Sequence, residues 1–202
     1  MSRCFSNVLW RFTASTFLLL VIIASFPITA PAADEPTHRW RWEFRTGYGW
    51  QYTNESRPSN FQIIPFMPSA AVPLTGYGGH GWLRGRWEWN PELFLALFNH
   101  PYLRPIFGIT PLQFHYELEP KGKWSPYLML GAGVLRSDIH RRETGSLLNF
   151  NSQGAVGIRY VLGSRLSLSG EYRHTHISNA GLNDDNSGMN THTFLAGISL
   201  EQ

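Results

Sequence analysis

A regular alternation of aromatic and charged residues restricts most strongly what this chain can fold into. Successive side chains of a β-strand point to opposite faces, so the stretch from Arg39 to Tyr52 predicts a strand with two very different faces. One face carries Trp40, Trp42, Phe44, Tyr48, Trp50 and Tyr52, and the other carries Arg39, Arg41, Glu43, Arg45 and Gln51. Soluble strands rarely combine so many aromatic side chains with arginines. The pattern favours a strand whose aromatic face forms part of a girdle in lipid.

The beginning of the chain has the composition of a secretory signal peptide. Arg3 and Arg11 precede an apolar run from Phe17 to Phe26, and small residues follow up to Ala32. Cleavage after Ala32 leaves residues 33–202 as one exported domain. The apolar run is much shorter than the ~20 residues of a membrane-spanning helix, which disfavours a permanent anchor.

Removal of this segment also changes the charge and the cysteine content. Cys4 is the single cysteine, so the mature chain has no thiol for a disulfide or a metal site. Without Arg3 and Arg11, the 17 Lys and Arg fall to 15 against 14 Asp and Glu, a net charge of +1. This balance gives no indication of a nucleic-acid partner.

The rest of the chain is rich in aromatic residues and glycine but has no second long apolar run. The sequence contains 8 Trp, 8 Tyr, 13 Phe and 19 Gly, so a chain like this crosses a membrane with strands. Segments of strand length lie at Trp40–Tyr52, Asn60–Pro73, Gly79–Trp89, Pro105–Leu118, Ser125–Arg136, Leu147–Leu162, Arg165–Ser178 and Met189–Leu200. Pro65, Pro68 and Pro73 predict a bulge or interruption in the second segment. We therefore expect an all-β fold, an eight-stranded antiparallel transmembrane β-barrel of the outer membrane.

Polar residues on the strand faces opposite the aromatic ones indicate what fills the barrel. Eight strands enclose a space that side chains just fill, so we expect a plug of packed polar residues and not a pore. The inward parity includes Arg41, Glu43 and Arg45, then Arg84, Arg86 and Glu88, then Gln113, His115 and Glu117. On the lipid face, an Arg or Lys at mid-depth would cost about 2–4 kcal/mol. A soluble barrel that holds a small ligand is the alternative, but it needs its aromatics inside and its charges outside.

A candidate catalytic pair ends the seventh segment. His176 and Ser178 are two residues apart, so in a strand they share one face with Leu168 and Tyr172, and that face points to lipid. A serine nucleophile needs a base within hydrogen-bond reach and a group that orients the base. His176 can be the base for Ser178, and Asn190 on the last segment reaches the same outer surface.

This last hairpin resembles the PagL-type lipid A 3-O-deacylases of Gram-negative outer membranes. The resemblance rests on the stretch His176–Leu182, followed by Asn186 and Gly188, within an eight-stranded barrel behind a signal peptide. In that family a serine, a histidine and a glutamate form a triad on the outside of the barrel. The triad hydrolyses the ester-linked acyl chain at the 3-position of lipid A.

The resemblance implies a role for each site residue. Ser178 would be the nucleophile and His176 the general base, whereas Asn186 would stabilise the oxyanion together with backbone amides near Asn179 and Ala180. It further implies that lipid A, or lipopolysaccharide, is the substrate, that outer-membrane lipids surround the protein and that no cofactor takes part. Pairing with a second copy as a homodimer is left open.

The third member of the triad departs from the family, because its glutamate aligns with Asn190. Three interpretations remain open: Asn190 suffices through its carbonyl oxygen, Asp184 or Asp185 takes over, or the chain is a weak or decayed enzyme. A non-catalytic barrel that binds lipopolysaccharide through the aromatic girdle and the basic loop from Arg136 to Arg142 is the alternative function.

A metal site is the rival chemistry. His174, His176 and His192 share the outward parity of neighbouring strands, and three imidazoles can bind zinc with an open position. The triad is favoured, since no carboxylate that could orient these imidazoles is evident nearby.

Overall fold

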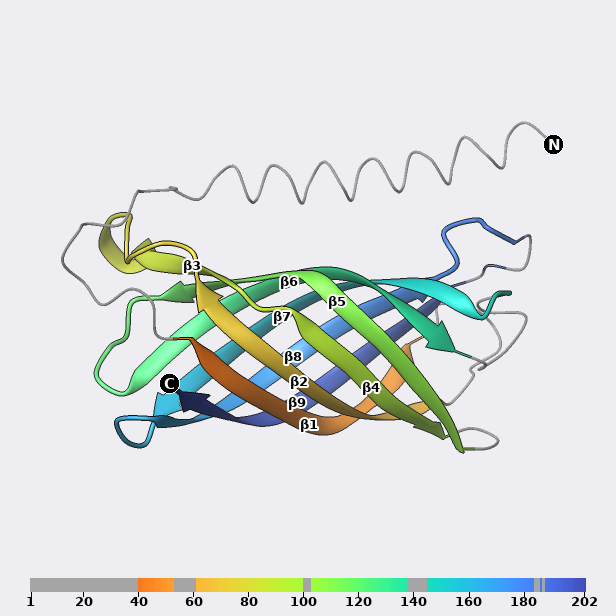
Figure 1. The fold of residues 1–202 in the computed structure, drawn as a ribbon, viewed down its shortest axis with the longest axis horizontal. Coiled ribbons are helices and arrows are strands. Elements are labelled where there is room, and N and C mark those ends of the chain that lie inside the picture. The colour runs from red at the N-terminus through yellow and green to blue at the C-terminus, as the bar shows by residue number, and fades with distance from the viewer. Residues whose placement is uncertain (1–39, 53–60, 100–102, 138–144, 184–185, 187) are drawn as a thin grey trace.

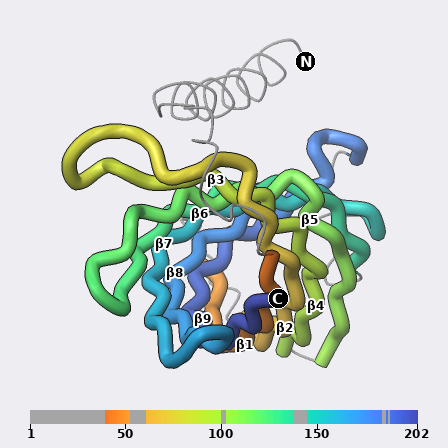
Figure 2. The backbone as a smooth tube through the Cα atoms, turned by 60° about the vertical axis from the view of Figure 1, so that its left-hand side comes forward, coloured from red at the N-terminus to blue at the C-terminus, as the bar shows by residue number. Residues whose placement is uncertain are grey.

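The chain forms one antiparallel sheet that closes on itself (Figure 1). The computed structural model describes residues 40–52, 61–99, 103–137, 145–183, 186 and 188–202, so the predicted signal peptide lies outside the described residues. The strands are β1 (Arg41–Tyr52), β2 (Gln62–Pro73), β3 (Gly85–Trp89), β4 (Glu92–Asn99), β5 (Leu103–Leu118), β6 (Trp124–Ser137), β7 (Leu148–Val161), β8 (Leu166–Ser178) and β9 (Met189–Glu201), and a 3₁₀-helix, η1, spans Gly81–Leu83. Strand β1 pairs with β2 on one side and with β9 on the other, which closes the ring (Figure 2). In the described part of the chain, no helix has the length and apolar character to cross a bilayer.

Strands β3 and β4 are two parts of one barrel strand. Both pair with β2 and both pair with β5, and the break between them falls at Asn90 and Pro91. Proline has no backbone N–H, so the ladder stops there. The Asn90 N–H donates instead to the Gln113 carbonyl oxygen at 2.8 Å. Eight strands therefore cross the wall, as the sequence predicts.

The third predicted segment was placed too early. Residues 79–84 form a turn and η1, so the strand begins at Gly85 and resumes in β4, which the sequence-based assignment left out. Arg84 therefore lies outside the wall, with an exposed side chain 3.3 Å from Glu119, and not in the interior. The prolines of β2 leave that strand continuous but interrupt its pairing with β1 beside Pro65.

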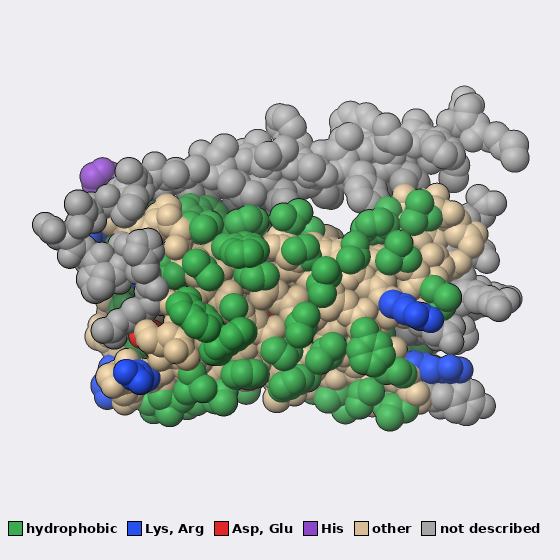
Figure 3. Space-filling view, viewed as in Figure 1, with side chains coloured by type: hydrophobic (Ala, Val, Ile, Leu, Met, Phe, Trp, Pro, Cys, Tyr) green, Lys and Arg blue, Asp and Glu red, His purple; other side chains and the backbone are tan. Residues whose placement is uncertain are grey.

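The outer surface of the barrel is apolar around its middle. Trp40, Trp42 and Trp50 are 37%, 42% and 41% exposed, which confirms the outward aromatic face of β1. Figure 3 shows hydrophobic side chains covering the wall, with Lys and Arg side chains near the two ends. Water would disfavour so much exposed apolar surface, so this belt is a lipid-facing surface.

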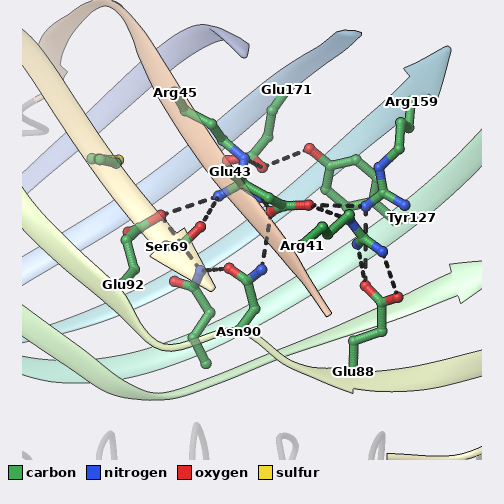
Figure 4. Close-up of polar contacts among 12 residues, drawn as sticks. Arg41, Glu43, Arg45, Ser69, Glu88, Asn90, Glu92, Tyr127, Arg159 and Glu171 are labelled. Carbon is green, nitrogen blue, oxygen red and sulfur yellow. Dashed lines mark hydrogen bonds and ion pairs between the residues drawn. The ribbon is translucent and has the colours of Figure 1, made fainter. Parts of the chain in front are cut away.

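An ion-pair network lies inside the barrel, and Figure 4 shows most of its members. Arg41, Arg45, Arg86, Arg159 and Arg173 meet an equal number of glutamates, Glu43, Glu88, Glu92, Glu117 and Glu171. Glu43 lies at its centre, with Nε of Arg41 at 2.8 Å, Nη2 of Arg159 at 3.2 Å and a contact with Arg45. Each buried charge has an opposite partner, which offsets its loss of hydration.

An apolar cluster also lies in the interior, beside buried polar side chains such as Gln51, Asn151, Thr175 and Thr191, so the expected polar residues are only part of what fills the barrel. This cluster consists of Phe61, Ile63, Met67, Phe94, Ala96, Phe98, Ile106, Leu135, Ile177, Met189 and Leu195. Several of these residues lie at the end of the barrel where β8 stops and β9 starts. Ile177 and Met189 are opposite each other in the β8–β9 register and are fully buried. Their burial anchors the ends of the two strands that carry the candidate site.

Candidate active site

The candidate residues lie on the outer wall at one end of the barrel. His176 and Ser178 are among the last three residues of β8, and they lie on the same face of the strand as the exposed Leu168 and Tyr172. Between them, Ile177 points inward into the apolar cluster. The predicted parity is therefore confirmed, and the packing of Ile177 holds the two neighbouring side chains on the lipid side.

Asn190 holds the imidazole of His176. The two residues are opposite each other in the β8–β9 register, and Nδ1 of His176 lies 2.9 Å from Oδ1 of Asn190. An amide oxygen only accepts, so Nδ1 carries the proton and Nε2 keeps its lone pair. Backbone at Gly188 packs against the same ring, since a Cβ built there would lie 2.9 Å from Cε1 of His176. In the neutral ring, this arrangement leaves Nε2 as the acceptor that a general base needs.

Ser178 is the last residue of β8 and is only 5% exposed. It faces Phe150 of β7 across the ladder. Among the described residues, its hydroxyl makes no hydrogen bond to His176. Catalytic hydrogen bonds are often long before substrate binds and tighten in the complex, so the shared face and the two-residue spacing are the relevant geometry.

A tight turn after Ser178 positions the predicted oxyanion residues. The Gly181 N–H donates to Oδ1 of Asn179 at 2.8 Å, and Ala180 adopts a positive φ of 54°. The Asn179 N–H donates to Oδ1 of Asn186 at 3.0 Å. This bond holds the Asn186 side chain at Asn179, the residue after Ser178, and leaves its NH₂ group free of that contact. Asp184 and Asp185 lie outside the described residues.

A second group of polar side chains lies next to the pair on the outer wall. Nδ1 of His192 is 2.6 Å from the Tyr172 hydroxyl, and the two rings are stacked at 5.8 Å. The His174 ring is 5.0 Å from that of His192. No group of three or more His, Cys, Asp or Glu side chains placed to hold a metal ion is found among the described residues. The sequence-based interpretation missed the bond from Tyr172, although the shared outward parity pointed to it.

An apolar hollow of about 260 Å³ continues along the wall from this group. Its outward-facing lining includes Phe114, Leu128, Leu130, Gly154, Val156 and Tyr172. Gly154 has no side chain to fill the wall at this point. The hollow therefore offers an apolar surface, starting at Tyr172, on the lipid side of the barrel.

The chain is similar to known proteins both in family and in fold. Residues 36–199 match the family model of lipid A 3-O-deacylase (PagL). A crystal structure of the outer membrane enzyme PagL is similar to the chain with a TM-score of 0.58 and 18% identity, covering 78% of this chain and 97% of that one. Neisserial surface protein A has a TM-score of 0.49 and 12% identity, covering 80% and 96%.

No curated protein matches the chain in sequence. The family match nevertheless spans most of the chain, from before β1 to residue 199 in β9. Together with the lipid-facing belt, this match shows that the chain belongs to the PagL family of lipid A 3-O-deacylases and is a β-barrel of the Gram-negative outer membrane.

Proposed function

We propose that the chain hydrolyses the ester-linked 3-hydroxyacyl chain at the 3-position of lipid A, with Ser178 as nucleophile and His176 as general base. The observation that carries this proposal is the bond from His176 Nδ1 to Asn190, made on the lipid-facing wall beside Ser178. A base that is oriented there can act on an ester only if the ester belongs to a lipid. The family's substrate meets this requirement.

The reaction proceeds in two steps. Nε2 of His176 accepts the Ser178 proton while Oγ bonds to the ester carbonyl carbon. The bond from that carbon to the sugar oxygen then breaks, and His176 returns the proton to the departing oxygen. Water, activated by the same nitrogen, releases the acyl chain as a carboxylic acid and restores Ser178. Asn190 orients the ring throughout and, as a neutral group, stabilises the imidazolium less than a carboxylate would.

Asn186 and the turn after Ser178 are the proposed oxyanion donors. The Asn186 NH₂ group and the Ala180 N–H lie in the segment that follows the nucleophile, so they suit the negative charge that develops on the carbonyl oxygen. The Asn179 N–H is bonded to Oδ1 of Asn186, so its role in the proposal is to hold the Asn186 side chain in place. Removal of one such donor typically costs a factor of about 10²–10³ in turnover.

The position of the site suits a lipid held in the outer leaflet. The connections after β1, β6 and β8 lie at the same end as the site and have nine or ten residues, whereas those after β5 and β7 at the opposite end have five and four; one connection at that end, residues 74–84, is also long. Long connections mark the external side of such barrels. The sugar headgroup would lie at this end, and the acyl chains would lie along the wall toward the apolar hollow.

The proposal is tested with folded protein in detergent micelles that contain lipid A, by measuring the fatty acid released. We expect wild-type activity, and a loss of at least 10³-fold in Ser178→Ala and His176→Ala, since triad members act as a unit. Ser152→Ala is the matched control, because Ser152 is opposite His176 on β7 and also faces outward. Full activity in Ser178→Ala, or none in the wild type, would refute the proposal.

A further inference from the structure

The connection between β2 and β3, residues 74–84, carries apolar side chains outside the ring of strands. Figure 2 shows it in yellow, extending sideways beyond the strands, and η1 forms its tip. Trp82 and Leu83 of η1 are 75% and 42% exposed, and Leu74 is 50% exposed. Of the large hydrophobic side chains in the described part of the chain, that of Trp82 is the most exposed. Water disfavours apolar surface of this size, which indicates a partner.

Hydrogen bonds hold this connection in one conformation. Gly78 and Gly85 exchange both of their backbone hydrogen bonds, at 2.8 and 2.9 Å. Nearer the tip, the Glu119 N–H donates to the Arg84 carbonyl oxygen at 2.8 Å, and the two side chains form an ion pair at 3.3 Å. Gly81 begins η1 with a φ of +62°, a conformation that glycine adopts without strain. The fold therefore presents Trp82 to the surroundings on an ordered turn.

The connection lies against the lipid-facing side of the wall. Tyr116 is on the outward face of β5, because its neighbours His115 and Glu117 point into the barrel. Nevertheless, Tyr116 is only 2% exposed. Its hydroxyl donates to the Leu83 carbonyl oxygen at 2.7 Å, and its ring lies 5.0 Å from that of Trp87. The connection thus covers a part of the wall that lipid would otherwise contact, and its tip lies beside the barrel.

Exposed aromatic side chains surround the barrel at the same end. Trp42 is the second residue of β1, and Trp124 is the first residue of β6. The ring of Tyr160, near the end of β7, lies 4.5 Å from that of Trp124. Tryptophan and tyrosine collect where the hydrocarbon of a bilayer meets the headgroups. Trp82 therefore continues the lipid-facing belt at the level of an aromatic girdle.

We propose that residues 74–84 form a membrane clamp, in which Trp82 and Leu83 insert into the phospholipid leaflet on the side opposite the candidate active site. The indole ring would lie against the acyl chains while its N–H stays with the headgroups. His80 and Arg84 flank the apolar pair with polar groups that suit the headgroup region. The clamp would fix the depth of the barrel in the membrane, and it does not depend on the proposed hydrolysis.

The position of the tip is tested with a nitroxide spin label in folded protein in dioleoylphosphatidylcholine vesicles. The sequence has one cysteine, Cys4, which Cys4→Ser removes, so the label attaches only to an introduced cysteine. Trp82→Cys is compared with Leu168→Cys on the lipid-facing wall and with Gly163→Cys in the exposed turn between β7 and β8, at the same end as the clamp. Collisions with oxygen report lipid, and collisions with a water-soluble nickel chelate report water.

The ratio of oxygen to nickel collisions decides the outcome. We expect the ratio for Trp82→Cys to lie nearer to that of Leu168→Cys than to that of Gly163→Cys. A ratio equal to that of Gly163→Cys would overturn the proposal, because the tip would then point into water.

The contribution of the clamp is tested by urea titration in the same vesicles. The double variant Trp82→Ser/Leu83→Ser should lower the equilibrium constant for folding by about tenfold, because partial burial of two large apolar side chains in lipid is lost. His80→Ser is the matched control in the same connection, since it removes no apolar surface, and it should leave the constant unchanged. An unchanged constant in the double variant would also overturn the proposal.

Discussion

The substitution Asn190→Asp tests the orienting partner of His176 with the smallest change in shape. Asparagine and aspartate have the same number of heavy atoms, so the 2.9 Å contact between Nδ1 of His176 and the side chain at position 190 is kept. Only the charge changes. A carboxylate stabilises the imidazolium that forms when His176 takes the Ser178 proton, whereas an amide oxygen does so weakly.

The size of the effect follows from this one contact. A hydrogen bond between neutral groups contributes about 0.5–1.5 kcal/mol, and one to a charged group about 1.5–3 kcal/mol. The difference of about 1.4 kcal/mol corresponds to a tenfold increase in kcat for Asn190→Asp. In Asn190→Leu the acceptor is lost and the tautomer is no longer selected, so kcat should fall by about 10²-fold or more.

Both variants are measured as kcat for fatty acid release from lipid A in micelles, with the heat-resistant folded band on gels as the control for assembly. If kcat of both variants stays within twofold of the wild type, Asn190 does not orient His176. In that case another group, such as Asp184 or Asp185, holds the base.

Three further changes test other parts of the structure. Gly188→Ala should lower kcat at least tenfold, because the new Cβ would lie 2.9 Å from Cε1 of His176 at a φ of +74°, whereas Gly163→Ala has no atom within 4 Å and should be neutral. Glu43→Gln should lower the free energy of unfolding by about 3–5 kcal/mol in urea titrations of the micelle-bound barrel, because it removes one carboxylate charge from the buried network and leaves five arginines with four glutamates. Val156→Arg, on the lipid-facing side of β7, should cost about 2–4 kcal/mol in the same titration, and no change would contradict the lipid-facing assignment.

The strands that sequence reasoning predicted well are those with two chemically different faces. In β1 the aromatic and charged residues alternate, and the structure places them on the lipid side and in the ion-pair network respectively. The missed strand, β4, has apolar residues on both faces, because Phe94 and Phe98 point into the apolar cluster while Leu93 and Leu97 face lipid. Alternation gives no signal in such a strand, and composition alone does not distinguish it from a buried helix.

For the candidate site too, sequence reasoning predicts some features and misses others. The shared face of His176, Ser178 and Asn190 follows from strand parity and is confirmed, although their catalytic roles stay predictions. The arrangement of the turn does not follow from periodicity, since the contact from Asn179 to Asn186 depends on the left-handed backbone at Ala180. The bond from Tyr172 to His192 needs the register between β8 and β9, which no single strand encodes.

The most direct test of the account is the mass spectrum of lipid A after incubation with the folded wild-type protein and with Ser178→Ala. For the wild type we expect a loss that corresponds to one 3-hydroxyacyl chain, and fragmentation should locate the new free hydroxyl at the 3-position of the sugar. Ser178→Ala should leave lipid A intact. Intact lipid A with both proteins, or a chain lost from another position, would contradict the account.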